Sequence, residues 1–116
     1  MQKNIFGKKG EIIAANFLKK KKFKILETNY KNKIGEIDIV AKHKKYLVFV
    51  EVKSRSNREF GDPAEAVDEQ KQFKIRQVAE LYLIEHKQTE KLCRFDVVAI
   101  VDGQDELSVR HIEDAF

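Results

Sequence analysis

The feature that most restricts the fold is the apolar run Tyr46–Val50, which leads directly into Glu51-Val52-Lys53. A short apolar run rich in branched and aromatic residues is typical of a central β-strand buried on both faces. Shorter apolar or alternating segments predict further strands at residues 23–30, 34–40 and 95–101, and an edge strand at 107–112. The central strand therefore has neighbours in the sequence with which it can pair.

Two helices are expected around these strands. An apolar stripe at helical spacing predicts a helix from Ile5 to about Lys22, built on Ile13, Ala14, Phe17 and Leu18. A second stripe predicts a helix from the cap Asp68 to about Lys87, built on Ile75, Val78, Ala79 and Tyr82. Between the third strand and this helix, residues 54–61 predict a surface loop, and Asp62-Pro63 suits the start of a short helical turn.

The order of these elements predicts the topology. Three consecutive strands with short turns, at Asn32-Lys33 and at 42–44, favour an antiparallel meander. The long helix after the third strand is a crossover that makes the next strand parallel to it. We therefore expect an α/β fold with an αβββαβ core, a mixed sheet flanked by helices, and a single domain over residues 1–116.

Composition excludes several classes of protein. The chain has 116 residues, of which 42% are hydrophobic and 36% charged, with one Pro and five Gly, so neither a collagen-like nor a disordered chain is expected. No apolar run is long enough to span a membrane, and the first twenty residues do not resemble a signal peptide. A single cysteine, Cys93, excludes an internal disulfide. We expect a reduced, cytoplasmic protein with no membrane partner.

The charge is divided unevenly along the chain. Residues 1–33 carry ten lysines against Glu11 and Glu27, whereas the remainder carries more acids than bases, so the overall net charge is only +4. Clustered cations favour a polyanionic partner because phosphates release counterions on binding. A solvated lysine-rich helix end is the alternative.

Glu51, Lys53 and Asp38 are the residues that best fit a chemical site. Residues i and i+2 of a strand share a face, so Glu51 and Lys53 point the same way, and Asp38 on the preceding strand lies near the level of Glu51 if the two strands form a hairpin. Two carboxylates and a backbone carbonyl, that of Val52, are ligands that Mg²⁺ or Mn²⁺ prefers. A neighbouring ammonium would orient water or stabilise charge on a phosphate.

The spacing Glu-x-Lys is not specific by itself. It also occurs at Glu69 and Glu85, both in the expected second helix, where i and i+2 point to different sides. Only the Glu51 pair follows an apolar strand and has an acid on the neighbouring strand. The alternative is an ordinary surface pair of charges across two strands.

Several longer segments resemble the YraN family of small bacterial proteins. They are residues 35–40 (GEIDIV), 47–56 (LVFVEVKSRS), 60–67 (FGDPAEAV) and 94–100 (RFDVVAI), together with the closing Ala115-Phe116. The resemblance covers the chain from about Gly7 to the end. That family in turn resembles the restriction-endonuclease-like nucleases, which include archaeal Holliday-junction resolvases.

The resemblance implies roles for individual residues. The acid on the second strand of these nucleases matches Asp38, and their Glu-x-Lys on the third strand matches Glu51 and Lys53. A glutamate on the first helix of some relatives matches Glu11, whose alternative role is an ordinary acid of a first helical turn. A polar residue on the helix after the third strand would be Gln70 or Lys71. Where many members have Pro-Asp, this chain has Ile37-Asp38.

Other polar residues fit a site less well. We interpret Glu36 as a solvated turn residue rather than a third ligand, and Asp96 as a buried hydrogen-bonding acid rather than a site carboxylate. Cys93 is interpreted as structural. The three histidines, at 43, 86 and 111, are expected at the surface, and no spacing brings two of them to one metal. Residues 54–58 form either a phosphate-holding loop or a polar loop without a ligand.

The function expected from these residues and the resemblance is metal-dependent cleavage of DNA, branched or otherwise structured. Asp38, Glu51 and the Val52 carbonyl would hold Mg²⁺ or Mn²⁺, Lys53 would position the attacking water, and Glu11 would assist. Contacts to the DNA backbone are expected from Lys8, Lys9, Lys19, Lys20, Lys21, Lys22 and Arg55. A homodimer would be needed to cut two strands symmetrically. The alternatives are a binding module for nucleic acid or protein on the same fold, and an adaptor in which the lysines only solvate the protein.

Overall fold

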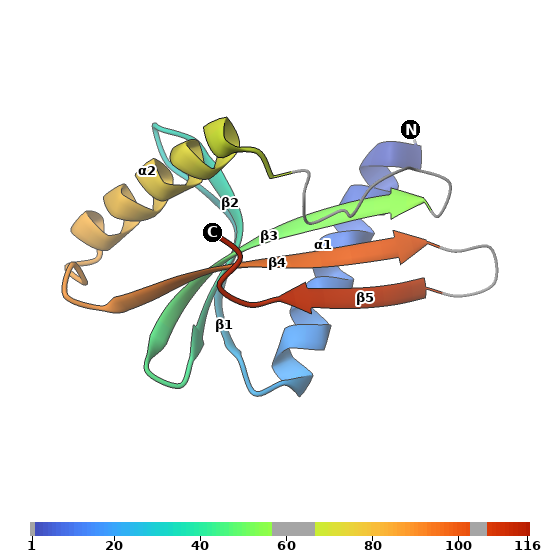
Figure 1. Ribbon diagram of the computed structural model, residues 1–116, viewed down its shortest axis with the longest axis horizontal. Helices are drawn as coiled ribbons and strands as arrows, with labels where there is room; N and C mark the ends of the chain where they lie inside the picture. The colour runs from blue at the N-terminus through green and yellow to red at the C-terminus, as the bar shows by residue number, and fades with distance from the viewer. Residues whose placement is uncertain (1, 57–66, 103–106) are drawn as a thin grey trace.

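The computed structural model describes the backbone of residues 2–56, 67–102 and 107–116, and the side chains of residues 9–54, 67–101 and 107–116. Seven elements follow one another in the chain (Figure 1): α1 (Gln2–Lys20), β1 (Lys24–Lys31), β2 (Glu36–His43), β3 (Tyr46–Ser56), α2 (Glu69–Glu85), β4 (Leu92–Asp102) and β5 (Leu107–Ile112). This order confirms the expected αβββαβ core with an additional edge strand.

The strands form one sheet in the order β1-β2-β3-β4-β5. β3 and β4 are parallel over their whole length, from Tyr46 opposite Leu92 to Ser56 opposite Asp102, and the other three pairs are antiparallel. The crossover through α2 explains the parallel pair, because a helix returns the chain to the same end of the sheet. The mixed sheet predicted from the sequence is confirmed.

The two helices cover opposite faces of this sheet. α1 packs Ala14 and Leu18 on one face, against a cluster that includes Val48, Val50 and Ile100. α2 packs on the other face, where its buried residues Ile75, Val78, Ala79 and Tyr82 meet Ile37, Phe49 and Val97. Burial of β3 on both faces accounts for its apolar composition. No helix in the described part of the chain is long and apolar enough to cross a membrane.

The start of α2 is set by a local capping interaction. Asp68 is in an extended conformation, and its carboxylate accepts a hydrogen bond from the backbone N–H of Lys71 at 2.8 Å. Such a cap satisfies one of the N–H groups that the first turn leaves without a partner. The cap was predicted from the sequence, and it orients the first turn of α2 next to the end of β3.

The segment after the central strand differs from expectation. Residues 54–56 belong to β3 and pair with residues 100–102 of β4, so the predicted surface loop does not begin at Ser54. The parallel ladder offers backbone partners to these polar residues, which outweighs their low strand propensity. The predicted helical turn at Asp62-Pro63 lies outside the described residues.

The C-terminal residues close over the α2 face of the sheet. The N–H of Ala115 donates to the carbonyl of Phe95 at 2.6 Å, and the ring of Phe116 stacks on Phe95 with a centroid distance of 5.3 Å. The guanidinium of Arg76 on α2 lies over both rings. The closing Ala-Phe pair therefore covers core residues of β4.

Candidate functional site

The β2–β3 hairpin brings Asp38 next to the polar end of the central strand. The β2–β3 ladder ends with Ile39 opposite Val50, and one step further Asp38 lies beside Glu51 and Val52. The backbone N–H of Val52 donates a hydrogen bond to Asp38 Oδ2 at 2.8 Å. This bond holds the Asp38 carboxylate beside the backbone of β3, at the level of Glu51 that the hairpin register predicted.

The sheet is distorted where Asp38 sits. Ile37 packs in the cluster under α2, whereas Ile39 packs in the cluster under α1, although alternate residues of a regular strand share a face. On the neighbouring strand, Asn29 has a φ of 54° between residues paired with Ile37 and Ile39. Strict alternation therefore fails at Asp38. Glu36 is exposed and lies 3.8 Å from Lys31, which agrees with its interpretation as a solvated turn residue.

Glu51 is a buried carboxylate with a cation beside it. Its side chain is 6% exposed, and Oε1 lies 3.3 Å from Nζ of Lys71 in the first turn of α2. Burial and the charge of Asp38 raise the pKa of Glu51 from 4.5 to about 7, although Lys71 and Lys53 oppose the rise. Burial also raises the pKa of Asp38, against the hydrogen bond from Val52 and the two lysines. The two carboxylates therefore repel each other in a poorly solvated place.

Two lysines complete this cluster. Burial and the adjacent ammonium of Lys71 lower the pKa of Lys53. The pKa of Lys71 is raised: burial would lower it, but the interactions with Lys53 and Glu51 outweigh that effect. An amine whose pKa is lowered holds its proton less tightly, which is a property of lysines that accept protons in catalysis.

Lys71 was only a weak candidate from the sequence, together with Gln70. The structure places Lys71 against Glu51, whereas the Gln70 side chain is exposed. The signal that distinguishes them is helical spacing: Lys71 lies four residues before Ile75 and seven before Val78, which α2 buries against the sheet. Gln70 does not share that face of the helix.

Glu11 approaches the same region from α1. Gly10 permits the close packing, because a Cβ at this position would lie 2.5 Å from Oγ of Ser54 at the end of β3. Glu11 is half-buried, and its Oε1 is buried with no hydrogen-bond partner. Burial and the charge of Asp38 raise the pKa of Glu11, against the effect of the Asn29 side chain. Glu11 thus adds a third carboxylate to the electrostatic environment of Asp38.

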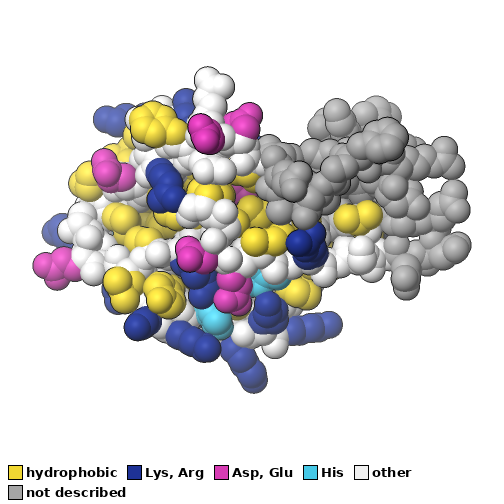
Figure 2. All heavy atoms as spheres, viewed as in Figure 1, with side chains coloured by type: hydrophobic (Ala, Val, Ile, Leu, Met, Phe, Trp, Pro, Cys, Tyr) yellow, Lys and Arg dark blue, Asp and Glu magenta, His cyan; other side chains and the backbone are white. Residues whose placement is uncertain are grey.

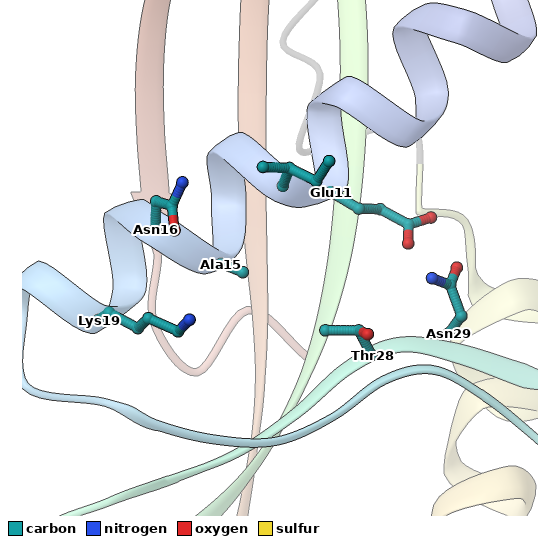
Figure 3. Close-up of a pocket in the computed structure, with 7 residues that line it drawn as sticks. Glu11, Ala15, Asn16, Lys19, Thr28 and Asn29 are labelled. Atoms are coloured by element: carbon teal, nitrogen blue, oxygen red, sulfur yellow. The ribbon is translucent and has the colours of Figure 1, made fainter.

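A groove between α1 and β1 leads away from Glu11. It has a volume of about 330 Å³ and contains Glu11, Asn16 and Lys19 from α1 and Thr28 and Asn29 from β1. Figure 3 shows the Glu11 carboxylate and the Asn29 amide at the same end of the groove, with Lys19 further along the helix. The groove therefore extends the carboxylate cluster toward polar side chains with hydrogen-bonding capacity.

The lysines predicted to contact DNA are not gathered at these carboxylates. Lys9 is exposed near Glu11, but Lys19–Lys22 lie at the C-terminal end of α1, where Phe23 stacks on His43 near the β2–β3 turn. Lys21 contacts Nδ1 of His111 at 2.7 Å and Glu113 at 3.9 Å. The side chains of Lys8 and Arg55 are outside the described residues. Lys19 lines the groove that begins at Glu11, whereas Lys20–Lys22 lie toward the opposite end of the sheet from Glu51.

Asp96 and His111 form a separate buried network. Asp96 is fully buried and accepts hydrogen bonds from Arg94, from Nε2 of His111 at 2.8 Å and from the N–H of Asp114 at 3.0 Å. This agrees with a buried hydrogen-bonding acid. The expectation of a surface His111 is wrong, because its side chain is 2% exposed. Alternation on the edge strand turns it inward to the carboxylate.

The other two histidines and the cysteine do not form a site in the described residues. His43 stacks on Phe23 at 3.9 Å, and burial with the charge of Arg94 lowers its pKa. His86 is exposed and contacts Glu27 at 3.6 Å. Cys93 is half-buried, and its thiol lies 3.5 Å from the carbonyl of Lys91.

The donor set fits a hard divalent cation that keeps much of its water. No group of three or more His, Cys, Asp and Glu side chains within the described residues has the arrangement of a metal site. Mg²⁺ does not need one, because it is commonly held by one or two carboxylates, water and substrate phosphates. Asp38 and Glu51 supply such a pair, and the partnerless Oε1 of Glu11 is a further acceptor nearby. These residues would hold the ion.

Comparison with known proteins identifies relatives along the whole chain. A model described as "Uncharacterised protein family UPF0102" matches residues 10–100. A UPF0102 protein of Caldanaerobacter subterraneus subsp. tengcongensis is 44% identical over 100% of this chain and 98% of its own length. A UPF0102 protein of Dictyoglomus thermophilum is 48% identical over 87% of this chain and 86% of its own length. The chain therefore belongs to the UPF0102 family, which is the YraN family that its motifs resemble.

Proposed function

We propose that this protein hydrolyses phosphodiester bonds of DNA with the help of Mg²⁺ or Mn²⁺. The observation that carries the proposal is the convergence of Asp38, Glu51 and Lys53 at the end of the central strand. The pKa values of both carboxyl groups are raised there, and the pKa of Lys53 is lowered. Burying charges in this way is costly unless a ligand compensates them. Groups with such perturbed pKa values are concentrated at functional sites.

Each residue has a distinct role in the proposed reaction. Asp38, held by the Val52 N–H, and Glu51 present oxygen atoms to the cation, and Glu11 extends this acidic surface. The bound cation supplies charge neutralisation at the phosphate and a lower pKa for a coordinated water. Lys53, whose pKa is lowered, accepts a proton from the attacking water. Lys71 provides a positive charge next to the phosphate oxygens.

The chemical balance of the step is simple. The water oxygen forms a bond to phosphorus while the bond from phosphorus to the leaving sugar oxygen breaks. The proton lost by the water passes to Nζ of Lys53, and the leaving oxygen acquires a proton from solvent. No oxidant, reductant or further co-substrate is needed, so two carboxylates and a lysine suffice for the protein's part.

Binding of Mn²⁺ tests the first half of this proposal. Calorimetric titration of the wild-type protein at pH 8 is expected to show binding of Mn²⁺, and Asp38→Ala and Glu51→Ala are each expected to weaken it at least tenfold, because each removes one of two carboxylate ligands. Glu80→Ala removes an exposed carboxylate of α2 and is the matched control, with unchanged binding. Equal affinity in the wild type and in both site variants would contradict the metal site.

A second candidate function is binding of nucleic acid without turnover. The Glu51–Lys71 ion pair favours it, because Lys71 already neutralises part of the carboxylate charge in the absence of a metal. The two functions differ in a measurable way. DNA binding that persists in Asp38→Ala and Glu51→Ala, in a protein that binds no Mn²⁺ and cleaves no DNA, would identify the binding module.

A further inference from the structure

A lysine-lined pocket lies at the end of the sheet remote from the carboxylates. It has a volume of about 210 Å³ and is lined by four lysines, Lys24, Lys42, Lys45 and Lys91, together with Leu26, Tyr46, Leu47 and Gln88. The four lysines come from the start of β1, the end of β2, the β2–β3 turn and the residue before β4. None of the residues that line it is Asp or Glu.

The strand register concentrates like charges in this pocket. Lys24 and Lys42 are directly opposite each other in the β1–β2 ladder. Like charges at directly opposed positions of two strands destabilise the sheet. The pairing of Lys24 with Lys42 is therefore unfavourable in the protein by itself. An anion between the two ammonium groups would attract both of them and offset their mutual repulsion.

The pocket is part of a wider basic surface. An adjacent depression, lined by Lys87, Gln88, Thr89, Glu90 and Lys91, shares Gln88 and Lys91 with the pocket and adds one further lysine and one acid. Figure 2 shows dark-blue Lys and Arg side chains along the lower edge of the molecule, where Figure 1 places the C-terminal end of α1 and the β2–β3 turn. A surface with this extent suits a chain of phosphates better than one small anion, because each lysine neutralises a separate phosphate and releases a counterion.

We propose that this lysine pocket, defined by Lys24, Lys42, Lys45 and Lys91, is an anchoring site for the phosphate backbone of nucleic acid, separate from the carboxylate site. β3 runs from Tyr46 at the pocket to Lys53 at the carboxylates. Seven residue steps of about 3.3 Å separate them by roughly 23 Å. At about 3.4 Å per base pair, a duplex of roughly seven pairs spans the two places. The anchor therefore contacts a different part of the nucleic acid from the carboxylate cluster.

Fluorescence anisotropy with a labelled 20-base-pair DNA duplex tests this site. The measurement is made in EDTA at several NaCl concentrations, so that it does not depend on the proposed hydrolysis. The variant K42Q/K45Q is expected to bind at least fivefold more weakly at 0.1 M salt. It is also expected to reduce the slope of log affinity against log salt by about two, because two phosphate contacts are lost.

The control variant K31Q/K33Q removes the same charge from the opposite end of β1. Both of its lysines are exposed and outside the pocket, and a change in affinity below twofold is expected. Equal weakening in the two variants would show that only net charge matters and would overturn the proposal. Unchanged binding in K42Q/K45Q would do the same. The proposal would also be overturned if the wild type did not bind the duplex but bound phosphatidylserine vesicles through these lysines.

Folding of the variant is checked by thermal unfolding. Because Lys42→Gln relieves the repulsion opposite Lys24, the melting temperature of K42Q/K45Q is expected to equal or exceed that of the wild type. Loss of DNA binding in a variant that melts no lower than the wild type therefore supports the anchoring site. A lower melting temperature for K42Q/K45Q would show that Lys24 and Lys42 do not repel each other in the folded protein. The argument for an anion between these two lysines would then fail.

Discussion

Replacing Glu51 by glutamine is expected to abolish most of the decrease in stability that the metal-free protein shows between about pH 4.5 and pH 7. Burial and Asp38 raise the pKa of Glu51 from 4.5 to about 7 in the folded protein. The folded state therefore holds this proton more tightly than the unfolded chain does. The contribution of Glu51 to the free energy of unfolding is therefore largest below pH 4.5, the pKa of this group in the unfolded chain. It decreases as the pH rises toward about 7, the pKa in the folded protein, and is constant above that.

The size of this effect is large for one side chain. A pKa of about 7 in place of 4.5 corresponds to about 3 kcal/mol of unfolding free energy. The raised pKa of Asp38 acts in the same direction. Glutamine has nearly the same shape and stays neutral, so the variant keeps the packing without the buried charge.

Urea unfolding in EDTA at pH 5 and pH 8 measures the difference. The wild type is expected to be less stable at pH 8 by a few kcal/mol, and Glu51→Gln by much less. Glu80→Gln, on the exposed side of α2, is the control and is expected to follow the wild type. If Glu51→Gln showed the same pH dependence as the wild type, Glu51 would not be a strained carboxylate.

Asp96→Asn is expected to destabilise the protein by about 3–5 kcal/mol, as removal of one partner of a buried ion pair does. Asp96 is fully buried, and both of its oxygens accept bonds from Arg94 at 2.9 Å. Burial alone would raise the pKa of Asp96, but hydrogen bonds from His111, Arg94 and Asp114 hold it below its usual value. An amide places an NH₂ group against donors and leaves the guanidinium without its buried counter-charge, so that only the half-exposed Glu113 remains as an ion-pair partner.

Equilibrium unfolding at pH 7 measures this effect against a neighbouring control. Glu113→Gln removes a half-exposed carboxylate 3.9 Å from Arg94, and a change below about 1 kcal/mol is expected. A loss of less than 1 kcal/mol in Asp96→Asn would contradict the assignment of this network as a main stabilising contact between β4 and β5.

The sequence predicted the elements that rely on strong local patterns. The apolar run at residues 46–50 identified the central strand, and the hairpin that follows from its neighbours brought Asp38 beside Glu51. The stripe and the Asp68 cap predicted α2, and alternation predicted β5 with the observed bounds. In each case, local propensity and tertiary packing favour the same structure.

The features that were missed depend on contacts between distant segments. The change of face between Ile37 and Ile39 and the positive φ of Asn29 require two strands to distort together, which a strand pattern does not encode. The burial of His111 follows from a carboxylate on another strand. Charge counting identified a lysine-rich first third of the chain but did not indicate that Lys20–Lys22 lie far from Asp38 and Glu51. A count along the chain contains no distance across the sheet.

The most direct test of the central claim is cleavage of a panel of DNA substrates, including single strands, duplexes, flaps and four-way junctions, in Mg²⁺ and in Mn²⁺. The wild type is expected to cut at least one substrate, and EDTA is expected to stop the reaction. Lys53→Ala is expected to reduce the rate at least 100-fold, because loss of a general acid–base group costs about that much. Glu80→Gln is expected to cleave like the wild type. An intact panel with both metals, or equal cleavage by Lys53→Ala, would contradict hydrolysis at this site.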